Sequence, residues 1–272
     1  MRPPQGKRVN RSHLLWRSVG ILALLSFLIL LTGFGLSLHP ETLAPAKPQL
    51  PESGNTNPSA KPAPLPTGTL NIVSLGDSLT RGTGDADGLG YIGRLRQSLE
   101  KEKKQPITLT NLGINGLKSA GLLDQLNQSQ VQKLLAQANI ITFTIGGNDL
   151  FQSSDTLQQL DKKKIEQATL ALRKNYTQIL QKLHQYNPNA TIIYIGLYNP
   201  FGDTEAAADT AGPVIAWNYE ASQIAANYNH VLVVPTYDLF YQKERQYLYT
   251  DHFHPNSDGY ARIAERILRA LQ

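Results

Sequence analysis

Cysteine is absent from this chain of 272 residues. Its absence excludes a disulfide framework, a thiol nucleophile, a cysteine-ligated zinc site and a lipid-modified N-terminal cysteine. No His/Glu pair has the spacing of a zinc peptidase helix, so we expect no metal. The pattern Gly-x-Ser-x-Gly is also absent, which argues against the nucleophile elbow of α/β-hydrolases.

Most of the chain also lacks an excess of positive charge. The formal net charge is +5, but residues 1–66 hold seven Lys and Arg against two acidic residues, Glu41 and Glu52. Residues 67–272 hold 19 charges of each sign. The basic character therefore belongs to the N-terminal part, and we expect no nucleic-acid partner for the rest of the chain.

Residues 18–38 form a run of 21 residues without a charge, preceded by Arg2, Lys7, Arg8, Arg11 and Arg17. A helix of that length rises about 30 Å, the thickness of the hydrocarbon core of a bilayer. The run predicts a basic cytoplasmic N-terminus over residues 1–17 and a transmembrane signal anchor over residues 18–38, with the remainder outside the cell. The alternative is a cleaved secretory signal and a secreted protein, although the run is long for one and lacks a small-x-small cleavage site at its exit.

Residues 39–67 contain eight prolines scattered among Ala, Ser, Asn and Thr. This composition resists helix and sheet and cannot bury a core, so it predicts an extended, semi-stiff spacer. The remaining residues, 68–272, are expected to form one domain.

Within this domain, short apolar runs alternate with longer stretches of helical periodicity. Most of the short runs are nearly continuous in apolar residues, which is typical of strands buried on both faces of a parallel sheet. The alternation predicts an α/β fold, a doubly wound, five-stranded parallel sheet with helices on both faces, preceded by the N-terminal transmembrane helix. The predicted strands are 70–75, 107–111, 140–145, 191–196 and 231–234, and the predicted helices are 91–104, 120–137, 165–186, 213–228 and 256–271.

Residues with catalytic potential follow several of these strands, and in such folds the carboxyl ends of the strands carry the reactive groups. A serine is a weak nucleophile until a nearby base takes its proton, and a histidine serves as that base when a carboxylate orients it. Amide N–H groups can stabilise the oxyanion that forms on an attacked ester. The segments concerned are Gly76-Asp77-Ser78-Leu79-Thr80, residues 111–116, Gly146-Gly147-Asn148-Asp149 and Asp251-His252-Phe253-His254.

The spacing of Asp251 and His254 couples a carboxylate to a base locally. The two residues lie three positions apart, so one turn of backbone presents both side chains on the same side. His252 is a rival base, but it lacks this offset.

These segments resemble the four blocks of the GDSL or SGNH hydrolases, in order and across residues 70–261, which is essentially the whole predicted domain. The resemblance implies a flavodoxin-like fold, with Ser78 as the nucleophile, His254 as the base and Asp251 as its orienter. It also implies an oxyanion hole made by the N–H of Ser78, a glycine and the amide of Asn148. We align the glycine with Gly116, but Gly113 remains an alternative. No cofactor is implied.

The family's usual work is the hydrolysis of carboxylic esters, so the resemblance implies a membrane-tethered, extracytoplasmic lipase or esterase with an ester substrate, lysophospholipids among them. It would act through an acyl-enzyme on Ser78. One alternative is an O-acetylesterase of cell-wall polysaccharide, and another is a non-catalytic envelope binding module on the same scaffold. The sequence does not decide among these substrates.

Other motifs favour structural roles. Asp77 is expected to brace the serine loop through backbone N–H groups, and Asp149 to cap the helix that follows it. Residues 88–93 satisfy Gly-x-Gly-x-x-Gly, but they lie too far beyond the first strand for a dinucleotide site. Aromatic residues near the site are expected to be mostly core or loop-packing residues, although some could line an acyl cleft; they are Tyr198, Phe201, Trp217, Phe240, Tyr241, Tyr247 and Tyr249.

Overall fold

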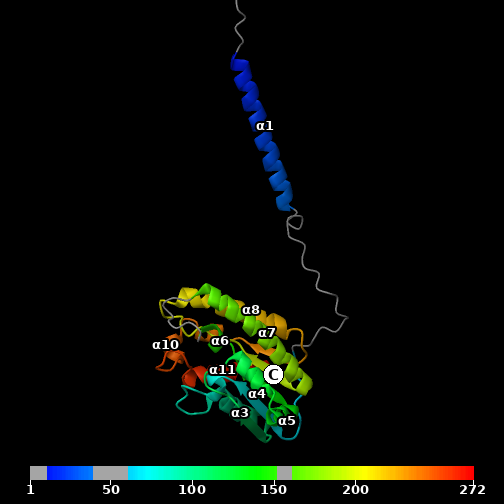
Figure 1. Ribbon diagram of the computed structural model, residues 1–272, viewed down its shortest axis with the longest axis vertical. Helices are drawn as coiled ribbons and strands as arrows, with labels where there is room; N and C mark the ends of the chain where they lie inside the picture. Colours follow the sequence, from blue (N-terminus) through cyan, green and yellow to red (C-terminus); the bar gives the residue numbers. More distant parts are fainter. Residues whose placement is uncertain (1–10, 39–60, 152–160) are drawn as a thin grey trace, which may run out of the picture. The chain divides into compact units, whose positions relative to one another are not determined.

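The structure is a computed structural model that describes residues 11–38, 61–151 and 161–272. The chain divides into two units, Met1–Asn55 and Thr56–Gln272. The described part of the first unit is a single helix, α1 (Arg11–Leu38) (Figure 1).

The transmembrane anchor predicted over residues 18–38 is not supported. Across the described ranges, no helix is both long enough and apolar enough to pass through a membrane. The prediction was based on the absence of charge from this run and on its length as a helix. The first ten residues of the predicted cytoplasmic segment lie outside the described residues.

The second unit is built on a five-stranded parallel sheet, in agreement with the predicted fold. Its strands lie in the order β2-β1-β3-β4-β5. The chain therefore first moves outward from β1 to β2 and then crosses to β3 on the other side. The strands are β1 (Leu70–Gly76), β2 (Ile107–Asn111), β3 (Ile140–Thr144), β4 (Thr191–Ile195) and β5 (Val231–Val234). Loops that leave β1 and β3 in opposite directions open a crevice at this reversal point, where doubly wound folds place their ligands.

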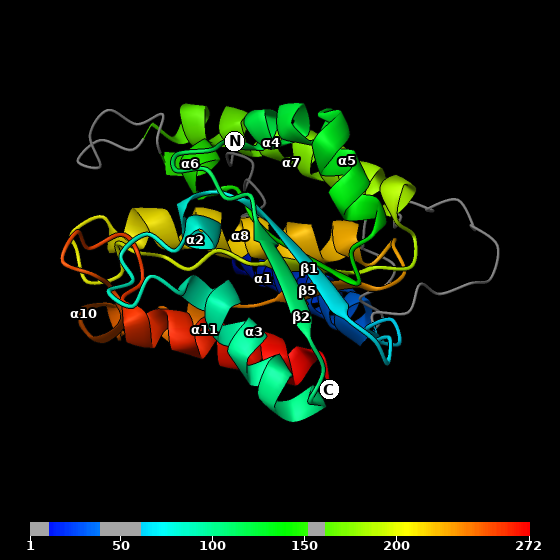
Figure 2. The ribbon, with the colours of Figure 1, turned by 90° about the horizontal axis from the view of Figure 1, so that it is seen from below.

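Helices cover both faces of the sheet (Figure 2). One face carries α3 (Gly90–Lys103) and α11 (Ser257–Ala270), and the other carries α4 (Ser119–Leu126), α5 (Ser129–Ala136), α7 (Lys162–Tyr186) and α8 (Ala207–Ala225). Each face has its own hydrophobic core because side chains alternate along a strand. In β1, for example, Ile72 packs toward α3 and α11, whereas Val73 packs toward the opposite helices.

Two predicted helices differ from the observed ones by more than three residues at an end or by a break. The stretch 120–137 forms α4 and α5 rather than one helix, because Gln128 has extended backbone (φ −76°, ψ 128°) and the carbonyl of Leu126 accepts from the side chains of Tyr186 and Gln132. The helix predicted from residue 213 begins at Ala207, so Pro213 lies inside α8. Four short helices connect the larger elements: α2 (Ser78–Arg81), α6 (Gly147–Phe151), α9 (Tyr237–Phe240) and α10 (Glu244–Tyr247).

Part of the predicted spacer packs on the second unit. Ala63 is buried, and its N–H donates to Thr191 Oγ1 at 2.8 Å. The carbonyl of Lys61 lies 3.1 Å from His230 Nδ1, and Leu65 packs against the core that contains α3 and α11. The last residues of the proline-rich segment thus belong to the folded unit, and residues 39–60 lie outside the described residues.

Candidate active site

Ser78 is the first residue of α2, directly after β1. Asp77 caps this helix, since its Oδ1 accepts the N–H of Leu79 at 3.1 Å and the hydroxyl of Thr144 at 2.7 Å. Burial raises the pKa of the Asp77 carboxyl, and these hydrogen bonds act in the opposite direction. Asp77 therefore braces the serine turn in the way its position predicted.

Buried hydroxyl groups fix the serine turn to the sheet. Thr80 Oγ1 donates to the carbonyl of Leu75 at 2.8 Å and lies 2.8 Å from Thr144 Oγ1 and 2.9 Å from the hydroxyl of Tyr91. The Tyr91 hydroxyl also lies 3.1 Å from Thr142 Oγ1. Because all these groups are buried, leaving one unpaired would be costly, so the network holds α2 in one position over the ends of β1 and β3.

Three predicted site residues form one chain of hydrogen bonds. His254 Nε2 lies 2.8 Å from Ser78 Oγ, although the two residues are 176 positions apart. His254 Nδ1 lies 2.7 Å from Asp251 Oδ2. A carboxylate can only accept, so Nδ1 carries the proton and Nε2 presents its lone pair to the Ser78 hydroxyl.

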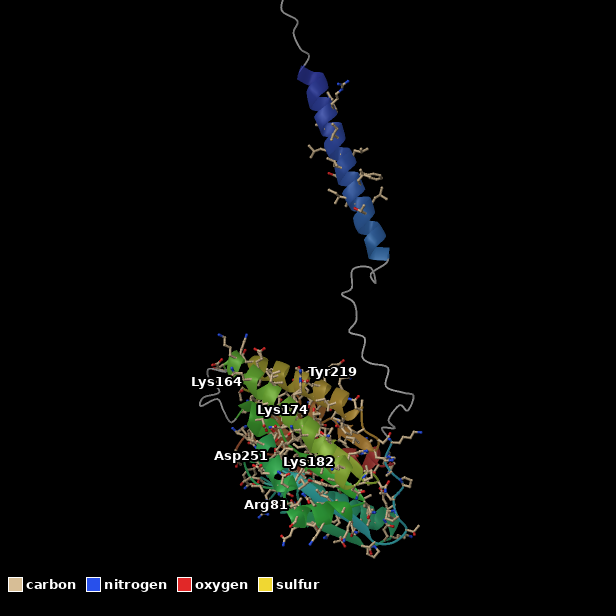
Figure 3. The ribbon with its side chains drawn as sticks, turned by 45° about the vertical axis from the view of Figure 1, so that its right-hand side comes forward. Arg81, Lys164, Lys174, Lys182, Tyr219 and Asp251 are labelled. Atoms are coloured by element: carbon tan, nitrogen blue, oxygen red, sulfur yellow. The ribbon has the colours of Figure 1, made fainter. Side chains whose placement is uncertain are left out.

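The local fold of the 251–254 turn holds the histidine. Asp251 Oδ1 accepts the backbone N–H groups of Phe253 at 3.0 Å and His254 at 2.9 Å. Partial burial acts to raise the pKa of Asp251, but the bonds from the His254 ring and from these N–H groups outweigh it and hold the pKa below its usual value. Asp251 thus stays ionised at neutral pH; Figure 3 labels it at the surface of the unit.

Neighbouring segments contact this turn. The hydroxyl of Tyr198 donates to the carbonyl of Phe253 at 2.6 Å, and the N–H of Tyr249 donates to the carbonyl of His254 at 2.7 Å. Gly84, which has a φ of +89°, also packs closely against this turn. A Cβ atom at Gly84 would come within 2.9 Å of His254 Cβ and 2.7 Å of the carbonyl oxygen of Pro255, so only glycine fits there.

The predicted oxyanion donors line the same cavity as the serine. This cavity of about 570 Å³ contains Ser78, Gly116, Asn148 and His254 in its lining. Asn148 Nδ2 donates one proton to the carbonyl of Leu117 at 3.0 Å, and this bond orients the amide. The second proton of the same amide group is not needed for that bond.

The two candidate glycines lie in different environments. The N–H of Gly113 donates to Asn111 Oδ1 at 3.0 Å, and Gly113 packs tightly against the backbone of Thr80 and Arg81. It does not line the cavity, whereas Gly116 does. The geometry therefore favours Gly116 as the donor.

The sequence predicted that Asp149 caps the helix that follows it, but the structure places Asp149 elsewhere. It lies inside α6, and its carboxylate accepts both the N–H and the hydroxyl of Ser119 at the start of α4. Asn148 and Asp149 thus both bind the segment that follows Gly116, and they link the two predicted oxyanion donors to each other.

His252 also lines the cavity, but His254 is the histidine bonded to Ser78. Of the aromatic residues considered from the sequence, Phe201 lines this cavity, whereas Trp217 and Phe240 are fully buried in the cores and Tyr241 is exposed. Sequence reasoning missed Phe151 and Phe253 as lining residues, although Phe253 stands between Asp251 and His254. Among the residues that the structure describes, no cluster of His, Asp and Glu could hold a metal ion.

Backbone N–H groups of the Gly-x-Gly-x-x-Gly motif donate to a side chain of the protein itself. The carboxylate of Asp85 accepts the N–H groups of Leu89 at 2.9 Å and Gly90 at 2.6 Å, at the start of α3. These N–H groups are the ones that would hold a phosphate at a helix N-terminus. The motif therefore serves the packing of this loop.

A flavodoxin-like sheet with a hydrogen-bonded Ser-His-Asp set at its reversal point is an arrangement typical of serine hydrolases. Residues 74–262 match the family model described as GDSL-like Lipase/Acylhydrolase family. The chain belongs to this family, and it is a carboxylic ester hydrolase.

Two relatives match most of the chain. An uncharacterized protein of Bacillus subtilis, YpmR, is 34% identical over 206 residues, which cover 74% of this chain and 81% of the relative. The spore germination lipase LipC of Bacillus licheniformis is 30% identical over 210 residues, which cover 74% of this chain and 96% of the relative.

Solved structures share the fold. The lipase Lip_vut3 from a goat rumen metagenome superposes with a TM-score of 0.68 at 28% identity, covering 74% of this chain and 97% of the lipase. An acetyl xylan esterase of Geobacillus stearothermophilus superposes with a TM-score of 0.56 at 21% identity, covering 75% of this chain and 95% of the esterase. The second similarity shows the common fold alone.

Proposed function

We propose that the protein hydrolyses carboxylic esters through an acyl-enzyme on Ser78. The observation that carries this proposal is the continuous set of hydrogen bonds from Ser78 through His254 to Asp251. His254 Nε2 takes the hydroxyl proton while Ser78 Oγ bonds to the ester carbonyl carbon, and Asp251 stabilises the imidazolium that results.

The negative charge of the tetrahedral intermediate falls on the former carbonyl oxygen. The N–H groups of Ser78 and Gly116 and the amide of Asn148 stabilise it, and they need no reorganisation because the fold already holds them. The imidazolium then protonates the leaving alcohol, which breaks the ester bond and leaves the acyl group on Ser78 Oγ. Water, deprotonated by His254, attacks this acyl group and releases the acid.

The substrate proposed is a lipid-type ester, with lysophospholipid as one candidate. Removal of acetyl groups from a polysaccharide is a second candidate, because Thr83 and Asn115 place polar side chains in the cavity lining that could contact a sugar hydroxyl. Comparing the hydrolysis of a lysophospholipid with that of an acetylated glycan separates the two. A non-catalytic binding role is disfavoured, because the chain belongs to a family of ester hydrolases.

A matched pair of histidine variants tests the assignment. His254→Ala and Ser78→Ala should each lower the hydrolysis of p-nitrophenyl butyrate by about 10³-fold or more, since members of such a set act as a unit. His252→Ala removes a ring that lines the same cavity and should retain most of the activity. Covalent labelling by a fluorophosphonate should occur at Ser78 and be lost in Ser78→Ala. Undiminished turnover by Ser78→Ala would overturn the proposal.

A further inference from the structure

Three phenylalanines from distant parts of the chain meet beside the serine. Phe151 ends α6, Phe201 follows β4, and Phe253 lies in the turn that carries the histidine. The ring centroids of Phe151 and Phe201 are 5.5 Å apart with their planes at 79°, and those of Phe201 and Phe253 are 6.0 Å apart. All three line the cavity that contains Ser78, and we call them the phenylalanine wall.

The wall begins next to the reacting atoms. The ring of Phe253 lies edge-on to the ring of His254, with centroids 5.0 Å apart. Phe151 and Phe253 also line a narrow second cavity of about 30 Å³, together with Ser78 and Asn148. A chain attached to a carbonyl carbon at Ser78 Oγ would therefore contact this wall from its first methylene groups.

The other side chains that line the cavity are not suited to bind a charged acyl chain. Among the described residues that line the large cavity, only Asp251 and the two histidines can carry a charge, and the polar groups belong to Thr83, Asn115, Asn148 and Thr204 beside Ser78. A phosphate or carboxylate on the acyl chain would find no lysine or arginine in this lining. The chemistry of the wall fits an uncharged, apolar chain.

The cavity is also large for an acetyl group. A water molecule occupies about 30 Å³ and a methylene group is of similar size, so a chain of eight carbons needs about 240 Å³. The cavity volume of about 570 Å³ exceeds this need. We infer that the phenylalanine wall binds the acyl chain of the ester and that the enzyme prefers longer acyl groups, such as octanoyl, over acetyl groups. This inference rests on the proposed function.

The test measures kcat/KM for p-nitrophenyl acetate, butyrate and octanoate with the full chain. In the wild type, kcat/KM should rise with chain length, by up to about fourfold for each methylene that the wall covers. Phe253→Ala keeps the backbone contacts of the turn, and Phe201→Leu keeps most of the buried volume of the side chain. Each should lower the octanoate-to-acetate ratio by about fivefold or more.

Tyr241→Ala is the matched control, because this exposed ring lies outside the cavity and its loss should leave both rates and their ratio unchanged. A wild-type preference for acetate would overturn the inference. So would a loss in Phe253→Ala that is equal for both esters, together with an unchanged ratio in Phe201→Leu. Activity retained by Ser78→Ala would instead overturn the proposed function, so the two failures are distinguishable.

Discussion

Ser257 Oγ donates a hydrogen bond to the buried carboxylate of Asp85 at 2.7 Å, across 172 positions of the chain. Ser257 is the first residue of α11 and follows the predicted base, His254, by three residues. Asp85 belongs to the loop after the serine helix and is also paired with Arg94. The bond therefore ties the segment that carries the nucleophile to the segment that carries the base.

The loss of this hydrogen bond should make the position of His254 less fixed without removing a contact to the substrate. For Ser257→Ala we expect kcat/KM for p-nitrophenyl butyrate to fall by about tenfold, because small displacements of a catalytic group are costly. The free energy of unfolding should fall by about 1.5–3 kcal/mol, the value of a hydrogen bond to a charged group. Ser257→Thr restores a hydroxyl at this position and should recover most of the rate; no recovery would argue against a positioning role.

Asp85 should make the stability of the protein sensitive to acid. Burial acts to raise its pKa, but hydrogen bonds from Arg94, Ser257 and backbone N–H groups outweigh it and hold the pKa well below the usual value. The folded state therefore binds this proton more weakly than the unfolded state. The stabilisation is complete above the ordinary carboxyl pKa of about 4 and is lost progressively as the pH falls below it.

The corresponding variant is Asp85→Asn, compared with wild type by urea unfolding across a pH series. At pH 7 the variant should be less stable by about 3 kcal/mol, because a buried pair is broken, and this difference should shrink below pH 4. Asp87→Asn is the control, since Asp87 contacts the same arginine from an exposed position and should cost less than about 1 kcal/mol. A difference that stays constant with pH would contradict this assignment.

Gly84 and Gly88 offer a matched test of how closely the base turn is packed. Both have a positive φ, but a Cβ atom would meet the His254 turn at Gly84 and nothing within 4 Å at Gly88. Each alanine variant should lose about 1 kcal/mol of stability from backbone strain. Only Gly84→Ala should also lower kcat, by about 10²-fold, because it displaces His254. Equal kcat values in the two variants would contradict this prediction.

The role proposed for Asn148 predicts an effect on kcat more than on KM. Asn148→Ala removes one donor to the oxyanion and should lower kcat by about 10²–10³-fold. Asn115→Ala removes a similar side chain from the same cavity lining and should lower kcat by less than about threefold. Steady-state kinetics with p-nitrophenyl butyrate measure both. A loss confined to KM would show that Asn148 only binds substrate.

The sheet was predictable because local periodicity encodes its strands. The residues predicted for the second and fifth strands are those of β2 and β5. Each of the other three strands differs from its prediction by a single residue at its C-terminal end. Helix ends were less predictable. Pro213 marks a helix start in many sequences, but here the preceding turn is already helical, and the hydroxyl of Thr210 bonds back to the carbonyl of Ala206.

The candidate site was predictable where its residues lie close in sequence. Asp251 and His254 are three positions apart, so their contact is formed within a single turn. Asp149 was misassigned because its partner, Ser119, lies 30 positions away on another helix. The phenylalanine wall was only partly predictable for the same reason. Phe201 was among the aromatic residues considered for an acyl cleft, but Phe151 and Phe253 were not, since the three residues come from separate loops or helix ends.

By itself, the sequence determined the strands, most of the helices, the absence of thiol chemistry and the residue types available for hydrolysis, because these follow from composition and from patterns a few residues long. Only the tertiary structure decided which histidine reaches Ser78, which glycine faces the cavity and what lines it. Those contacts depend on the order of the strands in the sheet, which places β1 beside β3 and brings the end of β1 next to a turn some 170 positions further along the chain. Local periodicity contains no information about that order, because the same strands could pair in several ways with equal local geometry.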